Sequence, residues 1–410
     1  MASQKRKILL FDSGKEWGGG TNSMLELLKR IDRQRFAITC CFYHNYRRAG
    51  EQTIEQVLAE MGIPMIALPP RQQPRWAKIA KEVGRSLLFF SRAARKSFTR
   101  KMDLLWRIYP DARRLRQTLV EGGFDMLYMN NQPGSNEEGY HAVRDLPVAL
   151  VQHCRIEPVL SPELVNIVNQ QIDQIIAVSQ GVERTLIQGG VDAARCTTVY
   201  NAIDIHQALP DRAHMRQTLG IDDETFVFGS IGSLIPRKSN HHTLAALARF
   251  QQQHPAANWK MVLVGAGPEQ GSLQRQASEL GIADRLLFTG FRNNPFDYLA
   301  TFDTFILASS SEGLPRVVLE AMLLGIPVVG SEVTGTAELV SHQQTGLLFP
   351  WSDSQLLASH LSLIWQDSAL RQRLADNGQQ LVHARYAIEH YVDGVENVLG
   401  HIQSRRSPHA

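Results

Sequence analysis

Short apolar segments alternate with longer helical stretches along almost the whole chain, and this rhythm limits the folds that it can adopt. Each apolar segment holds four to six residues, the length of a buried strand. Strands that alternate with helices predict βαβ units and parallel sheets, so the expected fold class is α/β. The first series of expected strands is 8–11, 37–42, 64–68, 126–129, 148–152, 174–178 and 197–200, and the second is 226–231, 260–264, 286–289, 304–308, 327–330 and 346–349.

The two series predict two domains. A chain of 410 residues is too long for one ordinary core. A polar connector, 204–222, lies between the series. We therefore expect two Rossmann-like, doubly wound parallel-sheet domains that face each other across a cleft, residues 1–205 and 206–384. The helical end, 385–410, is expected to pack back on the first domain.

Composition is that of an ordinary globular protein, with 43% hydrophobic and 20% charged residues. No apolar stretch approaches the roughly 20 residues of a membrane span. The basic start, 1–7, precedes an apolar segment too short for a signal-peptide core. The four cysteines form no C-x-x-C pair, which favours reduced core residues. The expected location is the cytoplasm, with peripheral attachment to the inner face of the plasma membrane as the alternative.

Residues 71–116 are strongly basic. They contain fourteen Lys or Arg and three acids, a local charge of +11 in a chain of net charge +3. Aromatic and aliphatic residues are interleaved with the cations, which is typical of helices that lie on anionic membrane surfaces. One alternative is a pair of solvated helices whose aromatic side chains face the core. Another is a nucleic-acid surface, but no recognised nucleic-acid module accompanies the stretch, so nucleic acid is not an expected partner.

The most informative segment for function is S-S-S-E-G-L-P-R-V-V-L-E-A-M-L-L-G-I-P-V-V, which contains Glu312 and Glu320. Glu312 lies on a loop after an expected strand, and Glu320 in the first turns of the following helix. Open α/β sheets bind ligands at this place. Backbone N–H groups at 313–317 suit a phosphate. Either glutamate alone is also compatible with a solvated loop or a helix-dipole contact. Together they indicate a ligand that is anionic and rich in hydroxyls, such as a nucleotide sugar.

This segment closely resembles the donor-binding E-x7-E signature of retaining glycosyltransferases of family 4, which have the GT-B fold. The resemblance extends to W-G-G-G-T at 17–21, I-I-A-V-S-Q at 175–180 and V-Y-N-A-I-D at 199–204, where Ala202 replaces the usual glycine. It implies that Gly19 and Gly20 face the donor phosphates. It also implies that His153, at the end of the strand 148–152, contacts the donor sugar as a catalytic residue.

In the second domain two adjacent cations, Arg237 and Lys238, follow a glycine-bearing expected strand and could balance a diphosphate. Lys238 matches a lysine of the family, whereas Ser233 stands where the family has arginine, and Arg237 is expected to supply that charge from the neighbouring position. Glu320 should bind the ribose hydroxyls, and Glu312 should face the transferred sugar as the second catalytic residue. Glu338 matches a family glutamate that is either a helix-start residue or a ligand contact. The remaining expected donor contacts are Gly290 and Phe291 beside the base, and Gly313, Leu314, Pro315, Arg316 and Val317 beside the phosphates.

These residues predict a retaining glycosyltransferase that moves a sugar from a nucleoside diphosphate to an acceptor hydroxyl. No Asp-x-Asp pair ends a strand, so neither a metal nor another cofactor is expected. The basic stretch 71–116 suggests an anionic membrane surface and a glycan or lipid-linked acceptor, as in polysaccharide, lipopolysaccharide or glycolipid biosynthesis. The alternatives are a GT-B nucleotide-sugar epimerase and a non-catalytic protein that binds sugar nucleotides or a membrane surface.

Overall fold

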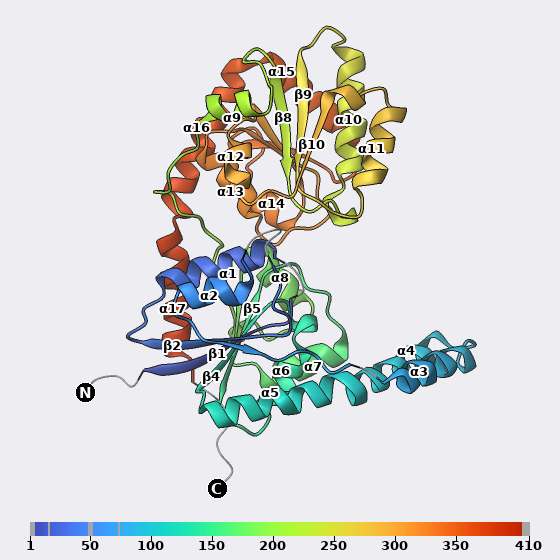
Figure 1. Ribbon diagram of the computed structural model, residues 1–410, viewed down its shortest axis with the longest axis vertical. Coiled ribbons are helices and arrows are strands. Elements are labelled where there is room, and N and C mark those ends of the chain that lie inside the picture. Colours follow the sequence, from blue (N-terminus) through green and yellow to red (C-terminus); the bar gives the residue numbers. More distant parts are fainter. Residues whose placement is uncertain (1–4, 15–16, 48–51, 73, 404–410) are drawn as a thin grey trace. The chain divides into compact units, whose positions relative to one another are not determined.

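The computed structural model describes residues 5–14, 17–47, 52–72 and 74–403, which form two compact units (Figure 1). Unit 1 comprises the described residues up to Ala177, then Glu183–Thr198, and those from Gly394 onward. Unit 2 comprises Val178–Val182 and Val199–Asp393. Each unit contains one parallel sheet with helices between successive strands, so the prediction of two Rossmann-like parallel-sheet domains is confirmed.

The sheet of unit 1 has seven strands in the order β3-β2-β1-β4-β5-β6-β7. Their bounds are β1 Arg6–Asp12, β2 Phe36–Phe42, β3 Met65–Ala67, β4 Met126–Asn130, β5 Ala149–Cys154, β6 Gln174–Ala177 and β7 Cys196–Thr198. The chain moves outward from β1 to β3 and then returns to place β4 beside β1. The strand order therefore reverses between β1 and β4, which is where doubly wound sheets bind ligands.

The α-helices of this part of the chain lie between the strands in sequence. They are α1 Gly19–Arg30, α2 Ile54–Glu60, α3 Arg75–Leu87, α4 Arg92–Asp103, α5 Tyr109–Gly122, α6 Glu137–Ala142, α7 Pro162–Gln171 and α8 Gln180–Gln188. Short 3-10 helices occupy Pro133–Ser135 (η2) and Ala193–Arg195 (η3). All four cysteines are buried and unpaired.

The basic stretch forms a helical hairpin made of α3 and α4, which lie side by side in Figure 1. α4 continues through a π-helical segment, η1 (Leu104–Ile108), directly into α5. A Cβ on Gly84 would lie 2.2 Å from the ring of Phe98, so the close approach of the two helices requires glycine there. The alternative in which the aromatic side chains face the core is wrong for Trp76, Phe89 and Phe90, which are exposed.

Unit 2 has a six-stranded parallel sheet in the order β10-β9-β8-β11-β12-β13. Its strands are β8 Phe226–Ile231, β9 Trp259–Val264, β10 Leu286–Gly290, β11 Thr304–Leu307, β12 Val328–Ser331 and β13 Gly346–Phe349. Its helices are α9 Arg212–Thr218, η4 Pro236–Lys238, α10 Asn240–Gln253, α11 Gln270–Glu279, η5 Ala283–Arg285, α12 Pro295–Leu299, α13 Arg316–Leu323, α14 Thr334–Leu339, α15 Ser354–Gln366 and α16 Ser368–Arg385. Phe228, Phe250 and Trp259 belong to a buried hydrophobic core on this sheet.

The last helix, α17 (Ile388–His401), begins in unit 2 and ends in unit 1. Its unit 1 part is held by side chains near β1 and β2. Arg6 Nη1 donates to Leu399 O at 2.8 Å, and Arg35 Nη1 lies 2.9 Å from Glu396 Oε2. Among the described residues, no helix combines the length and the apolar character that crossing a membrane requires.

Candidate functional site

The strand order of unit 2 reverses between β8 and β11, and the loops that leave these two strands meet. Ser310 N donates to Arg237 O at 2.8 Å, and Arg237 Nη1 donates to Ser311 O at 2.7 Å. The loop after β8 thus carries Arg237 and Lys238 directly to the loop that carries Glu312. Because this is the carboxyl end of a doubly wound sheet at its switch point, it is the expected ligand-binding edge.

The Glu312 carboxylate is buried and paired with two cations. Lys238 Nζ donates to Glu312 Oε1 at 2.6 Å, and Arg237 Nη1 lies 3.3 Å from the same oxygen. Burial alone would raise the pKa of Glu312, but the charges of Lys238 and Arg237 and the hydrogen bond from Lys238 outweigh it, so the pKa is lowered. The carboxylate is therefore ionised at neutral pH. Two cations against one carboxylate leave one positive charge at this edge.

The loop that holds Glu312 is fixed through its backbone. Gly335 N, in α14, donates to Glu312 O at 3.1 Å. A Cβ on Gly335 would lie 2.3 Å from Gly313 O, so only glycine permits this approach. On the other side, Asn201 Nδ2 donates to Leu314 O at 3.2 Å. The loop is thus held between α14 and the V-Y-N-A-I-D segment.

Glu320 lies one turn into α13, which begins at Arg316. Its carboxylate is partly exposed and lies 3.7 Å from Arg316 Nη2. Arg316 Nη1 also donates to Ala202 O at 3.3 Å. The first turn of an α-helix leaves backbone N–H groups without intrahelical acceptors. The start of α13, with Gly313, Leu314 and Pro315 buried before it and Val317 in its first turn, therefore offers donors suited to an anion.

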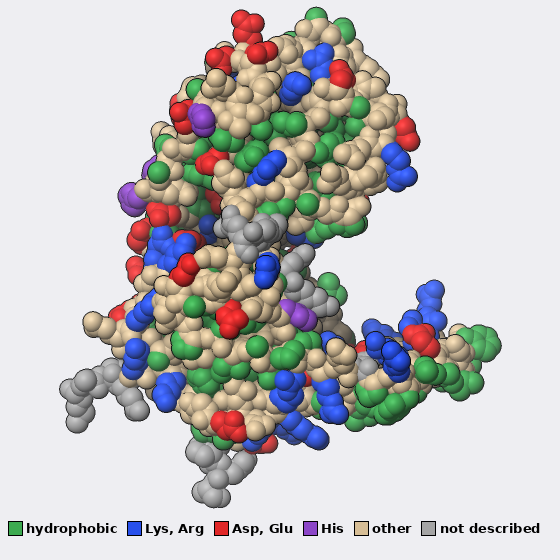
Figure 2. All heavy atoms as spheres, in the orientation of Figure 1, with side chains coloured by type: hydrophobic (Ala, Val, Ile, Leu, Met, Phe, Trp, Pro, Cys, Tyr) green, Lys and Arg blue, Asp and Glu red, His purple; other side chains and the backbone are tan. Residues whose placement is uncertain are grey.

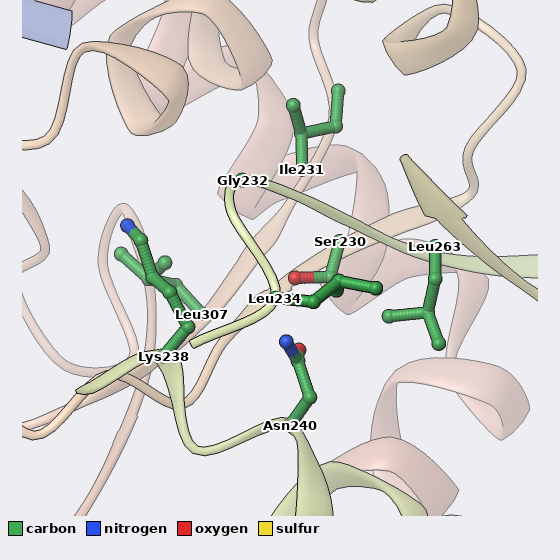
Figure 3. A pocket seen from close by; sticks show the side chains of 8 residues that line it. All are labelled: Ser230, Ile231, Gly232, Leu234, Lys238, Asn240, Leu263 and Leu307. Carbon is green, nitrogen blue, oxygen red and sulfur yellow. The ribbon is translucent and has the colours of Figure 1, made fainter. Parts of the chain in front are cut away.

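A narrow pocket lies at the carboxyl ends of β8, β9 and β11 (Figure 3). Figure 3 shows the polar side chains of Ser230, Lys238 and Asn240 there, and the other lining residues are Ile231, Gly232, Leu234, Leu263 and Leu307. The loops that follow β8 and β9 pack backbone against backbone, since a Cβ on Gly265 would lie 2.0 Å from Gly232 O. Gly265 N donates to Gly290 O at 2.9 Å. The structure thus places Gly290, followed by the exposed Phe291, next to these glycine loops.

The predicted glycines of unit 1 form the start of α1. Gly18 is the residue before the helix, and Gly19 and Gly20 are in its first turn. A Cβ on Gly19 would meet nothing within 4 Å, and one on Gly20 would only approach Arg155 Cγ at 3.7 Å. Packing within unit 1 therefore does not require glycine at these two positions. What glycine adds there is room for another group to approach the N–H donors of the helix start.

A buried polar network crosses the reversal point of the unit 1 sheet. Asp12 ends β1 and accepts hydrogen bonds from Asn130 Nδ2 and Gly14 N, both at 2.7 Å. Arg155 Nε donates to Asn130 Oδ1 at 2.8 Å. Burial raises the pKa of Asp12 to about 6, although both hydrogen bonds and the charge of Arg155 oppose the shift. This network was not predicted, and the only sequence signal for it was a carboxylate directly after the first apolar segment.

His153 lies within β5 and is fully buried. Its Nδ1 is hydrogen-bonded to the Tyr128 hydroxyl. Burial, assisted by the charge of Arg155, holds the pKa of His153 well below its usual value. The imidazole is therefore neutral at physiological pH, so any part it takes in chemistry is that of a neutral hydrogen-bonding group.

Glu338 has a structural contact in unit 2. Its two carboxylate oxygens accept hydrogen bonds from Gln180 N at 2.8 Å and Gly181 N at 2.9 Å. These are the first N–H groups of α8, so Glu338 caps that helix. The structure thus accounts for Glu338 without a ligand. It does so in a way that was not predicted, because Glu338 lies near the end of α14 (Thr334–Leu339) and caps the start of a different helix.

Comparisons with known proteins cover both halves of the chain. Residues 17–207 match the model of Glycosyltransferase Family 4, and residues 211–381 match that of Glycosyl transferases group 1. Among solved structures, the crystal structure of HepE from Anabaena in complex with UDP-glucose is similar with a TM-score of 0.76. It is 26% identical and covers 96% of this chain and 99% of its own.

Curated relatives match over a smaller part of the chain. The lipopolysaccharide core biosynthesis glycosyltransferase LpsD of Rhizobium meliloti is 30% identical over 181 residues, 44% of this chain and 51% of LpsD. The N-acetyl-alpha-D-glucosaminyl L-malate synthase of Bacillus anthracis is 28% identical over 244 residues, 58% of this chain and 62% of that protein. These matches span about half to three fifths of the relatives' own length.

Proposed function

Because the chain belongs to glycosyltransferase family 4, with a group 1 glycosyl transferase domain in its second half, we propose that it transfers a sugar from a nucleoside diphosphate donor with retention. The observation that carries the proposal is the cluster of Lys238, Arg237 and Glu312 at the switch point of unit 2. Glu312 lies on the loop that leads into the start of α13, so the two cations paired with it and the helix N–H donors share one edge of the sheet.

The proposed chemistry follows from charge. The bond from the anomeric carbon to the diphosphate breaks, and a bond from that carbon to the acceptor oxygen forms on the same face. The acceptor proton goes to the departing phosphate. Negative charge gathers on the diphosphate as it leaves, where Lys238, Arg237 and the N–H groups of α13 stabilise it. We propose that these cations provide that stabilisation without a divalent metal.

In this proposal Glu312 and Glu320 bind different portions of the donor. Glu312, held in place by its cations and by the backbone contacts of its loop, faces the transferred sugar. Glu320, which is partly exposed on α13, accepts hydrogen bonds from the ribose hydroxyls. Both assignments rest on the family resemblance. Gly19, Gly20 and His153 remain predicted donor contacts on the same ground.

We propose UDP as the nucleotide and a surface glycan or its lipid-linked precursor as the acceptor. HepE, at 26% identity, was crystallised with UDP, with UDP and glucose, and with UDP-glucose. Relatives include lipopolysaccharide core and Vi polysaccharide biosynthesis proteins. The donor proposal and the acceptor proposal are independent, since they rest on different proteins.

A thermal-shift titration with UDP-, GDP- and ADP-sugars tests the donor. A ligand that binds only the folded protein raises its midpoint, and we expect UDP-sugars to do so. Lys238→Met and Glu320→Gln should reduce the shift at equal ligand concentration. Lys260→Met is the matched control, because Lys260 lies near the amino end of β9, away from the site. A UDP-sugar shift unchanged in Lys238→Met would contradict the assignment.

Product analysis tests the reaction. With donor and a glycan acceptor, the new linkage should keep the anomeric configuration of the donor in an NMR spectrum, and excess EDTA should not reduce the rate. A new nucleotide sugar formed from donor alone would show an epimerase instead. Donor binding without transfer to any glycan or lipid acceptor would favour a non-catalytic sugar-nucleotide protein.

A further inference from the structure

The hairpin of α3 and α4 carries an apolar stripe that is largely exposed, although at one end the rings of Trp76 and Trp106 meet edge to face at 5.2 Å between centroids. Trp76, Ile79, Val83 and Leu87 recur at spacings of three and four, so they share one face of α3. Their exposed fractions lie between 51% and 69%. The turn that follows ends the stripe with Phe89 and Phe90, 80% and 72% exposed. Exposed apolar residues in such a contiguous row mark an interaction surface.

The stripe is not the face by which the hairpin packs on itself. α3 meets α4 through Gly84 against Phe98 and through the ion pair of Lys81 Nζ with Asp103 Oδ1 at 2.7 Å, and Ala77 is buried on the same side of α3. These residues lie on a different side of α3 from the stripe. The stripe is therefore a second apolar face, distinct from the face that packs on α4.

The hairpin is also strongly cationic. Residues 75–103 contain nine Lys or Arg and two acids, a net charge of +7. Lys81, Arg85 and Arg100 form ion pairs. The other six have no carboxylate at ion-pair distance within the described ranges: Arg75, Lys78, Arg92, Arg95, Lys96 and Lys101. Figure 2 shows apolar side chains along one side and the end of the hairpin, with Lys and Arg on the opposite side.

The base of the hairpin is fastened to the rest of unit 1. The guanidinium of Arg100, in α4, binds both carboxylate oxygens of Glu137, one of them at 2.7 Å. Glu137 is buried at the start of α6, and its pKa is lowered because hydrogen bonds from His141 and Arg100 outweigh the effect of burial. A bidentate pair to a buried carboxylate holds α4 in a defined direction.

A binding partner of the hairpin has to accommodate both its apolar stripe and its positive charge, and three kinds of partner can be compared. A second copy would bring the same +7 charge, which opposes pairing of two hairpins. Nucleic acid would satisfy the cations but leave the row from Trp76 to Phe90 in water. The interface of an anionic bilayer satisfies both, because apolar side chains enter the boundary of the acyl chains while Lys and Arg stay among the headgroups.

We propose that the α3–α4 hairpin is a membrane-interface anchor, with the stripe and the Phe89-Phe90 turn inserted and the unpaired cations on anionic headgroups. The inference rests on the proposed function, since a lipid-linked acceptor gives the anchor its use. The binding itself requires neither donor nor acceptor, so it is tested separately.

Flotation with vesicles of phosphatidylglycerol and phosphatidylcholine tests the anchor. The full chain should float with mixed vesicles and not with pure phosphatidylcholine. Phe89→Ser/Phe90→Ser should lower the partition coefficient by about tenfold or more, because two large apolar side chains no longer insert. Arg92→Gln/Arg95→Gln/Lys96→Gln should lower it by about a hundredfold at low salt, with less effect as salt rises.

Matched controls replace exposed residues outside the hairpin: Leu209→Ser for apolar surface and Arg144→Gln for charge. Both should float like the parent protein. Every variant should keep its UDP-sugar thermal shift, so a lost anchor is distinguished from a lost donor site. In addition, the fluorescence of Trp76, measured against Trp76→Phe, should shift to the blue on mixed vesicles.

Two results would overturn the proposal. One is equal flotation of the parent protein and both hairpin variants. The other is a dimer in analytical ultracentrifugation that Phe89→Ser/Phe90→Ser dissociates, since the stripe would then be an interface between copies of the chain.

Discussion

Replacing Lys238 by methionine tests the charge balance of the site. Glu312 is buried, and its Oε1 lies 2.6 Å from Lys238 Nζ and 3.3 Å from Arg237 Nη1. At an effective dielectric constant of about 20, unit charges at these distances attract by about 6 and about 5 kcal/mol. Removing one partner from a buried pair costs about 3–5 kcal/mol. Because Arg237 remains, we expect Lys238→Met to lower the free energy of unfolding of unit 2 by about 2–3 kcal/mol.

The pH dependence of this loss has a definite sign. The pKa of Glu312 is lowered in the folded protein, so its ionised form contributes stability that is present above the usual carboxyl range and lost as pH falls. Without Lys238, less charge opposes the effect of burial, so the pKa of Glu312 rises. The cost of Lys238→Met should therefore be largest at neutral pH and should shrink in acid, where Glu312 is protonated in the variant.

Urea unfolding of four proteins measures the effect: the parent, Lys238→Met, Glu312→Gln and the double variant. All four carry Trp17→Phe, Trp76→Phe and Trp106→Phe, so that the remaining tryptophans, Trp259, Trp351 and Trp365, lie in unit 2 and their fluorescence reports on its unfolding. In the Glu312→Gln background the lysine has no carboxylate partner, and its removal should cost less than about 1 kcal/mol. An equal cost in both backgrounds, or a cost independent of pH, would refute the reasoning, because the lysine would then stabilise the fold by packing alone.

Three further predictions each concern the replacement of a single residue. Since burial raises the pKa of Asp12 to about 6, the free energy of unfolding of unit 1 should contain a component that falls by about 2 kcal/mol as pH rises from 4 to 7, and urea titrations of Asp12→Asn should lack it. Glu338→Gln should weaken the start of α8 by about 1 kcal/mol and speed exchange of its first amide protons, measured by NMR; unchanged exchange would contradict the cap. Gly335→Ala should lower the unfolding midpoint and the UDP-sugar thermal shift because its Cβ would displace Gly313 O, whereas Gly271→Ala, with open space around it, should leave the thermal shift intact.

The strand pattern was predictable because burial on both faces makes a parallel strand continuously apolar. Each of the thirteen expected strands has a counterpart among the described residues. The polar connector 204–222 hid a helix, however. α9 begins after Asp211, whose side chain accepts from His214 N at 3.0 Å. α9 also contains Arg216, which is buried and donates hydrogen bonds to the carbonyl oxygens of Asp222 and Thr301. Because the buried side of this helix holds an arginine and not a row of apolar residues, the sequence shows no apolar periodicity there.

The predicted site residues differ in how much the sequence said of them. Arg237, Lys238 and Glu312 were expected at one edge because both of their loops follow parallel strands, and the structure joins them directly. Asn201 was recognised as part of a motif, but its hydrogen bond to Leu314 O was not foreseen. Side-chain contacts to a backbone carbonyl more than a hundred residues away have no signature in sequence spacing.

The sequence by itself determined the fold class, the two sheets and the family, because these depend on apolar periodicity and on short loops of restricted composition. Only the tertiary structure decided which way the charges and apolar surfaces face. The pairing of Glu312 with Lys238, the burial that neutralises His153 and the exposure of the stripe from Trp76 to Phe90 all follow from which elements pack together. Local sequence cannot specify these, since ionisation and exposure depend on neighbours brought close by the fold.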